Sequence, residues 1–202
     1  MAYWGFTALS QLQDKFGIEH RIVPLFDKEK LAAVAPSDIL MRQLKWAKRL
    51  PLFTEKGKSE SVISPILEEV WDTSTVSFTF FSGFTFDVDK AKKLTGRCDY
   101  IFSKEPDKIE ITAPVFCLVE AKDRTIVEGI PQAFAEMYAA ALFNEKHGFS
   151  HAVMHGCVTN AVSWRFLELH EGKYARIDGV EYATDSELPL LLSNFQRIIL
   201  SI

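Results

Sequence analysis

The residues best suited to chemistry in this 202-residue chain stand at the end of an apolar run, in the stretch "FCLVEAKD" at positions 116–123. Residues 116–119 predict a buried β-strand, and Glu120 and Lys122 follow with only Ala121 between them. Two residues apart on a strand, Glu120 and Lys122 point to the same face of a sheet, and Ala121 points to the other. A charge at such a place is costly unless it is paired or bound.

A second carboxylate lies one strand earlier, because Asp99 falls inside the stretch "GRCDYIF". If the two strands are neighbours, Asp99 and Glu120 converge at one edge of the sheet and repel each other unless a cation lies between them. Mg²⁺ or Mn²⁺, which prefer oxygen ligands, would remove that repulsion. Lys122 can orient or deprotonate an attacking water, or stabilise a developing oxyanion, since the pKa of a lysine falls on burial and near a metal.

Helices and strands must position these residues, and the periodicity of apolar positions predicts them. The first 35 or so residues favour a short helix or a pair of strands. Thr184 and Glu187 occupy capping-box positions for the last helix. Four helices are expected over residues 37–50, 60–71, 128–147 and 184–200. Six strands are expected over 75–86, 97–103, 114–122, 150–158, 163–169 and 173–177. A loop is expected over 54–59.

The order of these elements is α-α-β-β-β-α-β-β-β-α, which predicts an α/β (α+β) fold in which helices flank a mixed β-sheet. We expect one domain over residues 1–202. Within it we expect a helical extension over 1–58, a core over 59–170, and a hairpin end with the last helix over 171–202.

The pattern of Asp99 followed by Glu120-x-Lys122 resembles the signature of the PD-(D/E)XK nuclease superfamily, which has the restriction-endonuclease-like fold. The resemblance spans roughly residues 59–170 and is nearest in pattern to the nuclease domain of type I restriction motor subunits. "SESVISPILEEVW" looks like the first core helix of that fold, and "IPQAFAEMYAAAL" looks like the helix after the Glu-x-Lys strand. Cys98 stands where the motif's name has Pro, and Ala161 fills a turn position where relatives often have Gly.

The resemblance implies roles for individual residues. Asp99, Glu120 and the carbonyl of Ala121 would hold Mg²⁺ or Mn²⁺, and Lys122 would lie beside the attacking water. The first core helix often opens with a functional glutamate, which Glu60 matches, with Glu69 a weaker candidate. The following helix often carries a polar residue near the site; Gln132 fits, and Glu136 lies one turn away on the same face.

The implied function is metal-dependent hydrolysis of phosphodiester bonds in nucleic acid, with DNA the expected substrate and cleavage leaving a 3′-hydroxyl and a 5′-phosphate. The alternative is a nuclease-fold protein that binds nucleic acid or another partner, with weak or lost catalytic activity. An unrelated α/β domain is a third interpretation, and it requires the carboxylates of Asp99 and Glu120 to lie far apart.

Each candidate residue also has a purely structural interpretation. Glu120 and Lys122 can be a solvated strand end, with Asp99 paired to Arg97, and Glu60 can be a helix N-terminal carboxylate stabilised by the helix dipole. Gln132 can be an ordinary polar residue of the first turn. His151, His155 and Cys157 share one face of a predicted strand and suggest zinc, but three ligands spread along one strand close a tetrahedron poorly.

Composition narrows the class of protein and its partners. The formal net charge of −4 does not favour non-specific binding to nucleic acid, although residues 42–58 carry six basic side chains and one acid. Three scattered cysteines argue against a disulfide framework and favour a reducing, cytoplasmic location. No signal peptide or membrane span is expected. The last helix is more apolar than a surface helix needs, which allows a homodimer interface formed by Leu188, Leu190, Leu191, Leu192, Phe195, Ile198 and Ile199.

Overall fold

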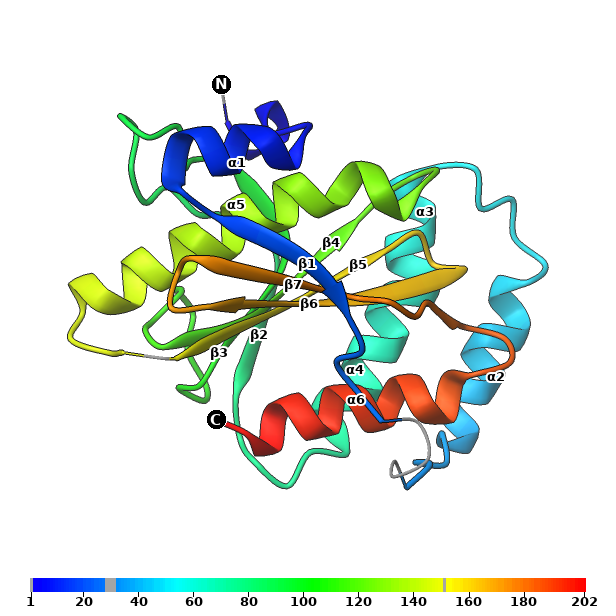
Figure 1. Ribbon diagram of the computed structural model, residues 1–202. Coiled ribbons are helices and arrows are strands. Elements are labelled where there is room, and N and C mark those ends of the chain that lie inside the picture. The colour runs from blue at the N-terminus through cyan, green and yellow to red at the C-terminus, as the bar shows by residue number, and fades with distance from the viewer. Residues whose placement is uncertain (1, 28–31, 151) are drawn as a thin grey trace.

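A mixed β-sheet with helices on both faces forms the molecule, as the order of elements predicts (Figure 1). The computed structural model describes residues 2–27, 32–150 and 152–202. The strands lie in the order β1-β7-β6-β5-β4-β3-β2, with β8 paired to β6. Their bounds are β1 Glu19–Val23, β2 Thr79–Thr85, β3 Arg97–Ser103, β4 Val115–Ala121, β5 Val153–Thr159, β6 Ser163–His170, β7 Tyr174–Asp178 and β8 Tyr182–Ala183.

Strand β4 lies inside this sheet, antiparallel to β3 and parallel to β5. Parallel neighbours need a long crossover, and the 21-residue helix α5 (Ile126–Lys146) provides it. Every residue of β4 is buried, because helices cover both faces of the sheet at this point. The candidate residues at the end of β4 therefore lie beneath α5.

Two hydrophobic cores lie on opposite faces of the sheet. Helices α1 (Leu9–Phe16) and α5 cover one face, and α2 (Asp38–Ala47), α4 (Ser64–Asp72) and α6 (Leu188–Leu200) cover the other (Figure 1). Leu118 packs under α5, whereas Cys117, Val119 and Ala121 pack on the opposite face. This alternation turns Glu120 toward α5 and Ala121 away from it.

The loop predicted over residues 54–59 is wrong, because this segment is helical. Thr54 caps α3 (Glu55–Lys58) by accepting a hydrogen bond from the Gly57 amide, and α3 continues through the wide-turned π-helical segment η2 (Ser59–Ile63) into α4. Pro65 lacks the N–H that would bond back to residue 61, and the Ser64 amide bonds instead to the Ser59 carbonyl. The Tyr100 hydroxyl, 3.0 Å from the Ser64 hydroxyl, ties this segment to β3.

The first residues contribute more to the sheet than a helical extension would. A short 3₁₀ turn, η1 (Tyr3–Gly5), and α1 precede β1, which pairs in parallel with β7. The expectation of a short helix or a strand pair thus gives one helix and one strand. Strand β1, within the predicted extension, therefore supplies an edge of the same sheet that carries the candidate site.

The capping box predicted for the last helix is wrong. Helix α6 begins at Leu188, and no side chain caps it. The Thr184 hydroxyl instead accepts a hydrogen bond from Trp164 Nε1 at 2.9 Å and donates one to the Ala161 carbonyl at 2.7 Å. Thr184 thus holds the β5–β6 turn, in which Ala161 has a left-handed φ of 72°.

The apolar side of α6 packs into the molecule itself. Leu191, Leu192, Phe195, Ile198 and Ile199 are buried in the core against the sheet. Their apolar character is explained without a second copy of the chain, so the sequence argument for a homodimer loses its basis and the dimer stays an untested prediction.

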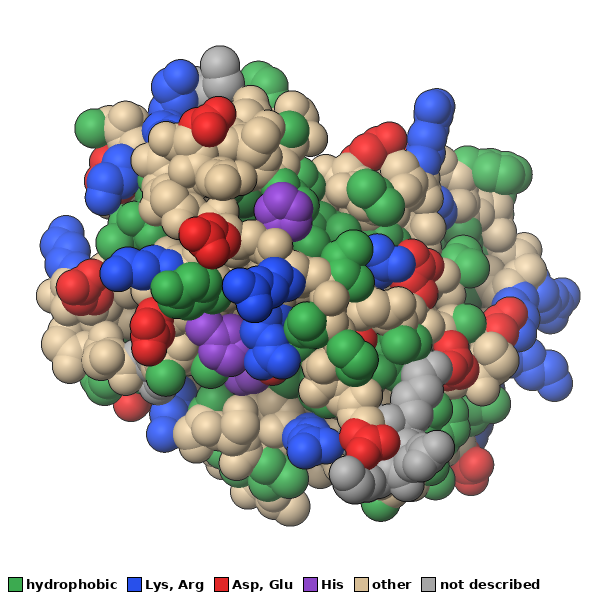
Figure 2. All heavy atoms as spheres, in the orientation of Figure 1, with side chains coloured by type: hydrophobic (Ala, Val, Ile, Leu, Met, Phe, Trp, Pro, Cys, Tyr) green, Lys and Arg blue, Asp and Glu red, His purple; other side chains and the backbone are tan. Residues whose placement is uncertain are grey.

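The outer surface is mixed in charge. On the face shown in Figure 2, acidic and basic side chains alternate with apolar ones. None of the described helices is long and apolar enough to cross a bilayer. Cys98, Cys117 and Cys157 are buried free thiols in β3, β4 and β5, as their positions in predicted strands imply.

Candidate active site

Strands β3 and β4 bring Asp99 and Glu120 together. Tyr100 is paired with Val119, so the next antiparallel step sets Asp99 opposite Glu120. Asp99 Oδ2 accepts a hydrogen bond from the Ala121 amide at 2.7 Å, which fixes the carboxylate at the end of β4. The two carboxyl groups lie close enough for Glu120 to influence the pKa of Asp99, so these acids do not lie far apart.

Helix α5 adds two polar side chains to this pair. Lys122 Nζ donates to Glu120 Oε1 at 2.5 Å and to Gln132 Oε1 at 2.9 Å. Gln132 Nε2 in turn donates to Glu136 Oε1 at 3.1 Å, one helical turn further along. Glu136 also lies beside Glu120. The result is a connected polar cluster, which we call the carboxylate cluster: Asp99, Glu120, Lys122, Gln132 and Glu136.

Gly129 allows α5 to approach the strands this closely. A Cβ on Gly129 would lie 2.6 Å from Val158 Cγ1 and 2.9 Å from Lys122 Cγ, distances that real Cβ contacts do not show. A glycine at this point therefore lets the helix press on the aliphatic part of Lys122 and direct its ammonium toward Glu120 and Gln132.

Two carboxylate oxygens of the cluster lack a donor. Glu120 and Glu136 are 2% and 0% exposed, and Glu120 Oε2 and Glu136 Oε2 have no hydrogen-bond partner among the described residues. Buried polar atoms are nearly always satisfied, so two unsatisfied acidic oxygens side by side require an explanation. A proton shared between the carboxyls, or a bound cation, would satisfy them.

Burial shifts the protonation of all three acids in the same direction. Burial raises the pKa of Asp99, although the hydrogen bond from Ala121 and the charge of Lys122 oppose the shift. Burial, then repulsion from Glu136 and Asp99, raises the pKa of Glu120 well above its ordinary value. Burial raises the pKa of Glu136 to about 8, against the hydrogen bond from Gln132. The cluster thus retains protons that exposed carboxylates would have lost.

Lys122 differs from the expectation that its pKa falls. Burial lowers the pKa of its ammonium, but the adjacent Glu120 carboxylate outweighs this, so the pKa is raised overall. In this structure Lys122 is a cation held by Glu120 and Gln132. It is therefore suited to orienting a water molecule or stabilising negative charge rather than to removing a proton.

An open cleft of about 430 Å³ gives solvent access to Asp99. Glu55, Lys56, Ser59, Glu60 and Ser64 of the α3–α4 segment form one wall. Ser82 and Gly83 of β2, with Arg97, Asp99 and Tyr100 of β3, form the other. The cleft is lined mostly by polar atoms, as expected for a site that binds an ionic ligand.

Glu60 lies in this cleft, but at its rim. Its side chain is 66% exposed and lies 3.7 Å from the Lys56 ammonium, and it is separate from the carboxylate cluster. Glu69, the weaker candidate, is occupied elsewhere, because its two oxygens accept hydrogen bonds from the amide and hydroxyl of Ser37. Glu69 thus joins α4 to the start of α2.

Glu55 is a cleft residue that the sequence did not reveal. Its pKa is raised, first by the limited water around it in the cleft and then by the Asp99 carboxylate. Thr54 directly before it, followed by a run of helix-compatible residues, is the signal that could have identified a helix start. At the other end of α3, Lys58 forms an ion pair with Asp123 at 3.2 Å, and this pair joins α3 to the segment that follows β4.

The other structural interpretations fit less well. Glu120 is buried, so the end of β4 is not solvated. No ion pair joins Asp99 to Arg97 within the described ranges, although the guanidinium charge of Arg97 lowers the pKa of Asp99 slightly. His151 lies outside the described residues. Cys157 is buried in the apolar core, and His155 Nε2 lies 3.4 Å from the Ser201 hydroxyl.

The donor set fits a magnesium-like ion better than a closed metal site. Among the described residues, no three His, Cys, Asp or Glu side chains are arranged to hold one metal ion. Mg²⁺ commonly binds through only one or two carboxylates, with water and substrate phosphate as its other ligands. Asp99 and Glu120, with an unsatisfied oxygen on Glu120, match that description.

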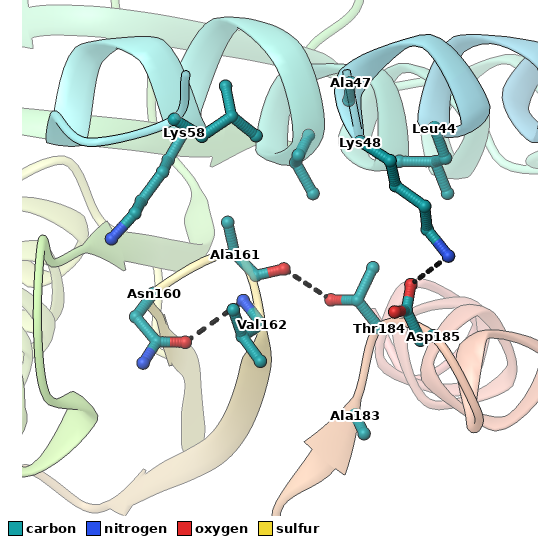
Figure 3. A pocket seen from close by; sticks show the side chains of 12 residues that line it. Leu44, Ala47, Lys48, Lys58, Asn160, Ala161, Val162, Ala183, Thr184 and Asp185 are labelled. Carbon is teal, nitrogen blue, oxygen red and sulfur yellow. Dashed lines mark hydrogen bonds and ion pairs between the residues drawn. The ribbon is translucent and has the colours of Figure 1, made fainter. Parts of the chain in front are cut away.

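A second cavity, of about 250 Å³, lies between α2 and the β5–β6 turn (Figure 3). Its polar groups already have partners: Asn160 Oδ1 accepts from the Val162 amide, and Lys48 pairs with Asp185 at 2.9 Å. The rest of the lining is apolar, including Leu44, Ala47 and Val62. This cavity therefore lacks groups for catalysis.

Comparisons with known proteins identify no relative of this chain, so its function must be inferred from the carboxylate cluster. No protein-family model, no curated protein and no solved structure matches this chain. The fold and cluster define the class only as a mixed α/β protein with buried acidic residues and a lysine at one strand end.

Proposed function

We propose that this protein is a metal-dependent nuclease of the PD-(D/E)XK type, which hydrolyses phosphodiester bonds in nucleic acid, with DNA the expected substrate. One observation carries the proposal. Asp99 and Glu120 meet where β3 begins and β4 ends, and Glu120 Oε2 is buried without a donor among the described residues while Lys122 lies beside it. An unpaired buried acid is costly, and a divalent cation would offset that cost.

Asp99, Glu120 and the Ala121 carbonyl would hold Mg²⁺ or Mn²⁺. In a strand, the N–H and C=O of one residue point to the same side. The Ala121 amide bonds to Asp99, so its carbonyl also faces the β3 side of β4. A bound ion would polarise the phosphate and lower the pKa of water.

Lys122 and Gln132 would act on the same water and phosphate oxygens. Gln132 Oε1 fixes one N–H of the Lys122 ammonium and Glu120 Oε1 fixes another, which leaves the third to donate to a ligand. Glu60 and Glu55, on the opposite wall of the cleft, would hold water around the ion or bind a second one. The buried free thiols suit a reducing compartment, so we propose a cytoplasmic location.

The alternative function is nucleic-acid or partner binding on a nuclease-like fold without catalysis. The net charge of −4 and the exposure of Glu60 favour it. A cleavage assay separates the two functions.

The test is cleavage of supercoiled plasmid and of single-stranded DNA with Mg²⁺ or Mn²⁺. We expect the wild type to cut, and Asp99→Asn and Lys122→Gln to lose activity by at least about a hundredfold, the usual scale for a group that stabilises developing charge. Asp107→Asn and Lys108→Gln are matched controls, because both residues are exposed in the β3–β4 connection. They should cut as the wild type does.

Metal binding provides a readout independent of activity. Mn²⁺ should raise the melting temperature of the wild type and of Asp107→Asn, but not of Asp99→Asn, since a ligand that binds only the folded state stabilises it. If Asp99→Asn and the wild type cut DNA at equal rates, the proposal that this protein is a nuclease would be refuted. Metal binding without cutting would favour the alternative.

A further inference from the structure

The solvent side of α2 carries basic and aromatic side chains in one stripe. Arg42, Lys45 and Trp46 are spaced as i, i+3 and i+4, which places them on one face of the helix. Arg49 follows in the turn after α2, and all four side chains are exposed. Leu40, Leu44 and Ala47 bury the opposite side. The structure therefore uses α2 as an amphipathic helix whose outer face is cationic.

Trp46 is unusual at such a place, because its side chain is 57% exposed and covers no core. The segment after α2 continues the pattern with Phe53, which is 83% exposed. Tryptophan and phenylalanine are usually largely buried, so two exposed rings flanked by cations mark a surface that binds something. We call Arg42, Lys45, Trp46, Arg49 and Phe53 the α2 face.

The α2 face is followed in the chain by the segment that borders the cleft beside Asp99. Two residues after Phe53, Glu55 begins α3, and Glu55 and Lys56 form part of the cleft wall. Basic side chains protrude at the side of the molecule where Figure 1 places α2 (Figure 2). No described residue forms an ion pair with Arg42, Lys45 or Arg49, so these charges are not neutralised by the described part of the chain.

We propose that the α2 face binds single-stranded nucleic acid and guides it to the cleft. Single strands are bound by cations that follow the phosphates and by aromatic rings on which bases stack. In a duplex the base faces are already stacked, so Trp46 and Phe53 would find no partner. Arginine and aromatic residues also occur in protein interfaces, but cations without an acidic partner among the described residues, beside exposed rings, match what phosphates and bases require. Delivery of the strand to the cleft for cleavage rests on the proposed nuclease function. Binding of the strand by the α2 face does not.

The test is the affinity of the full chain for a fluorescently labelled 20-nucleotide oligo-dT, measured by anisotropy in EDTA so that no cleavage occurs. Trp46→Ala and Phe53→Ala should each weaken binding about fivefold or more, the scale of one lost base stack. Trp46→Phe should restore most of the affinity. Trp4→Ala is the matched control, because Trp4 is 69% exposed outside the α2 face, and it should bind as the wild type does.

Salt dependence tests the cations of the α2 face separately from its rings. Lys45→Gln should reduce the slope of log affinity against log salt by about 0.7, the value for one lost contact to a single-strand phosphate. Lys108→Gln, in the β3–β4 connection, should leave the slope unchanged. Duplex DNA of the same length should bind more weakly than oligo-dT, and its affinity should not depend on Trp46.

Three results would overturn the proposal: equal affinity of Trp46→Ala and wild type for oligo-dT, tighter binding of the duplex, or binding only to phosphatidylglycerol vesicles. The last would assign the α2 face to a membrane surface. The binding assay contains no metal, so its result does not depend on whether the protein cleaves nucleic acid. Binding that depends on Trp46 without any cutting supports this proposal alone, whereas cutting with unchanged binding by Trp46→Ala supports only the nuclease.

Discussion

Replacing Glu136 by Gln should stabilise the metal-free protein at neutral pH. Glu136 is fully buried on α5, accepts one hydrogen bond from Gln132, and has no donor for Oε2 among the described residues. A glutamine keeps the shape of the side chain and carries no charge. Its amide N–H can also donate to the neighbouring Glu120, whose Oε2 has no donor either.

The size of the effect follows from the pKa of Glu136, which burial raises from 4.5 to about 8. Between these values the folded state holds a proton that the unfolded state has lost, so stability falls as the pH rises. At pH 7 the cost to the wild type is about 3 kcal/mol, and above pH 8 it approaches about 5 kcal/mol. A gain of about 3 kcal/mol at pH 7 corresponds to a rise of about 6–12 °C in melting temperature for a chain of this length.

The assay is denaturant unfolding in EDTA at pH 4, 7 and 8.5, with Glu136→Gln compared with the wild type. The advantage of the variant should be small at pH 4, where both states of the wild type are protonated, and should grow with pH. Glu145→Gln, an exposed residue of the same helix, is the control and should show no such trend. A variant that is less stable than the wild type at pH 8.5 would refute the reasoning.

Two further predictions concern backbone positions near the site. Ala161→Gly should raise the free energy of unfolding by about 0.5–1 kcal/mol, because a left-handed φ of 72° costs alanine more than glycine, and Ala183→Gly, in strand β8, should lower it. Gly129→Ala should lower the free energy of unfolding by about 1–3 kcal/mol, since the new Cβ would overlap Val158 and Lys122. Thermal unfolding checks both, and a stabilised Gly129→Ala, the usual result in a helix, would contradict the close packing of α5.

The central sheet and the grouping of the candidate residues on it could be predicted because their signals are local. Continuous apolar runs bounded by turns identified β3 and β4, and the two-residue period of a strand placed Glu120 and Lys122 on one face. The long apolar helix after β4 implied a crossover to a parallel strand, which α5 and β5 form. Glu136 followed from the four-residue spacing to Gln132, although its complete burial could not be known from the sequence.

The α3–η2 segment was missed because the Thr54 capping signal is outweighed by the loop propensity of the residues after it. Gly57 within a charged run favours a loop by intrinsic propensity. The helix forms because Val62 and Ile63 pack into the core and because the Thr54 side chain caps it. Tertiary packing thus overrides local preference here, and the error hid Glu55. β1 was uncertain for a related reason, since its partner β7 lies more than 150 residues away in the chain.

The distribution of charge is compatible with the proposed nuclease function of an acidic chain. The acids of the carboxylate cluster are buried around a place where a cation would neutralise them, so they contribute little to the field that a nucleic acid meets. The outward positive charge near the cleft comes instead from Arg97 in its wall and from the basic residues of the 42–58 segment. A net charge of −4 over the whole chain would then limit non-specific binding elsewhere, while the proposed α2 face would attract phosphates near the cleft. If this is correct, affinity for single strands should depend on the α2 face and hardly at all on lysines outside it.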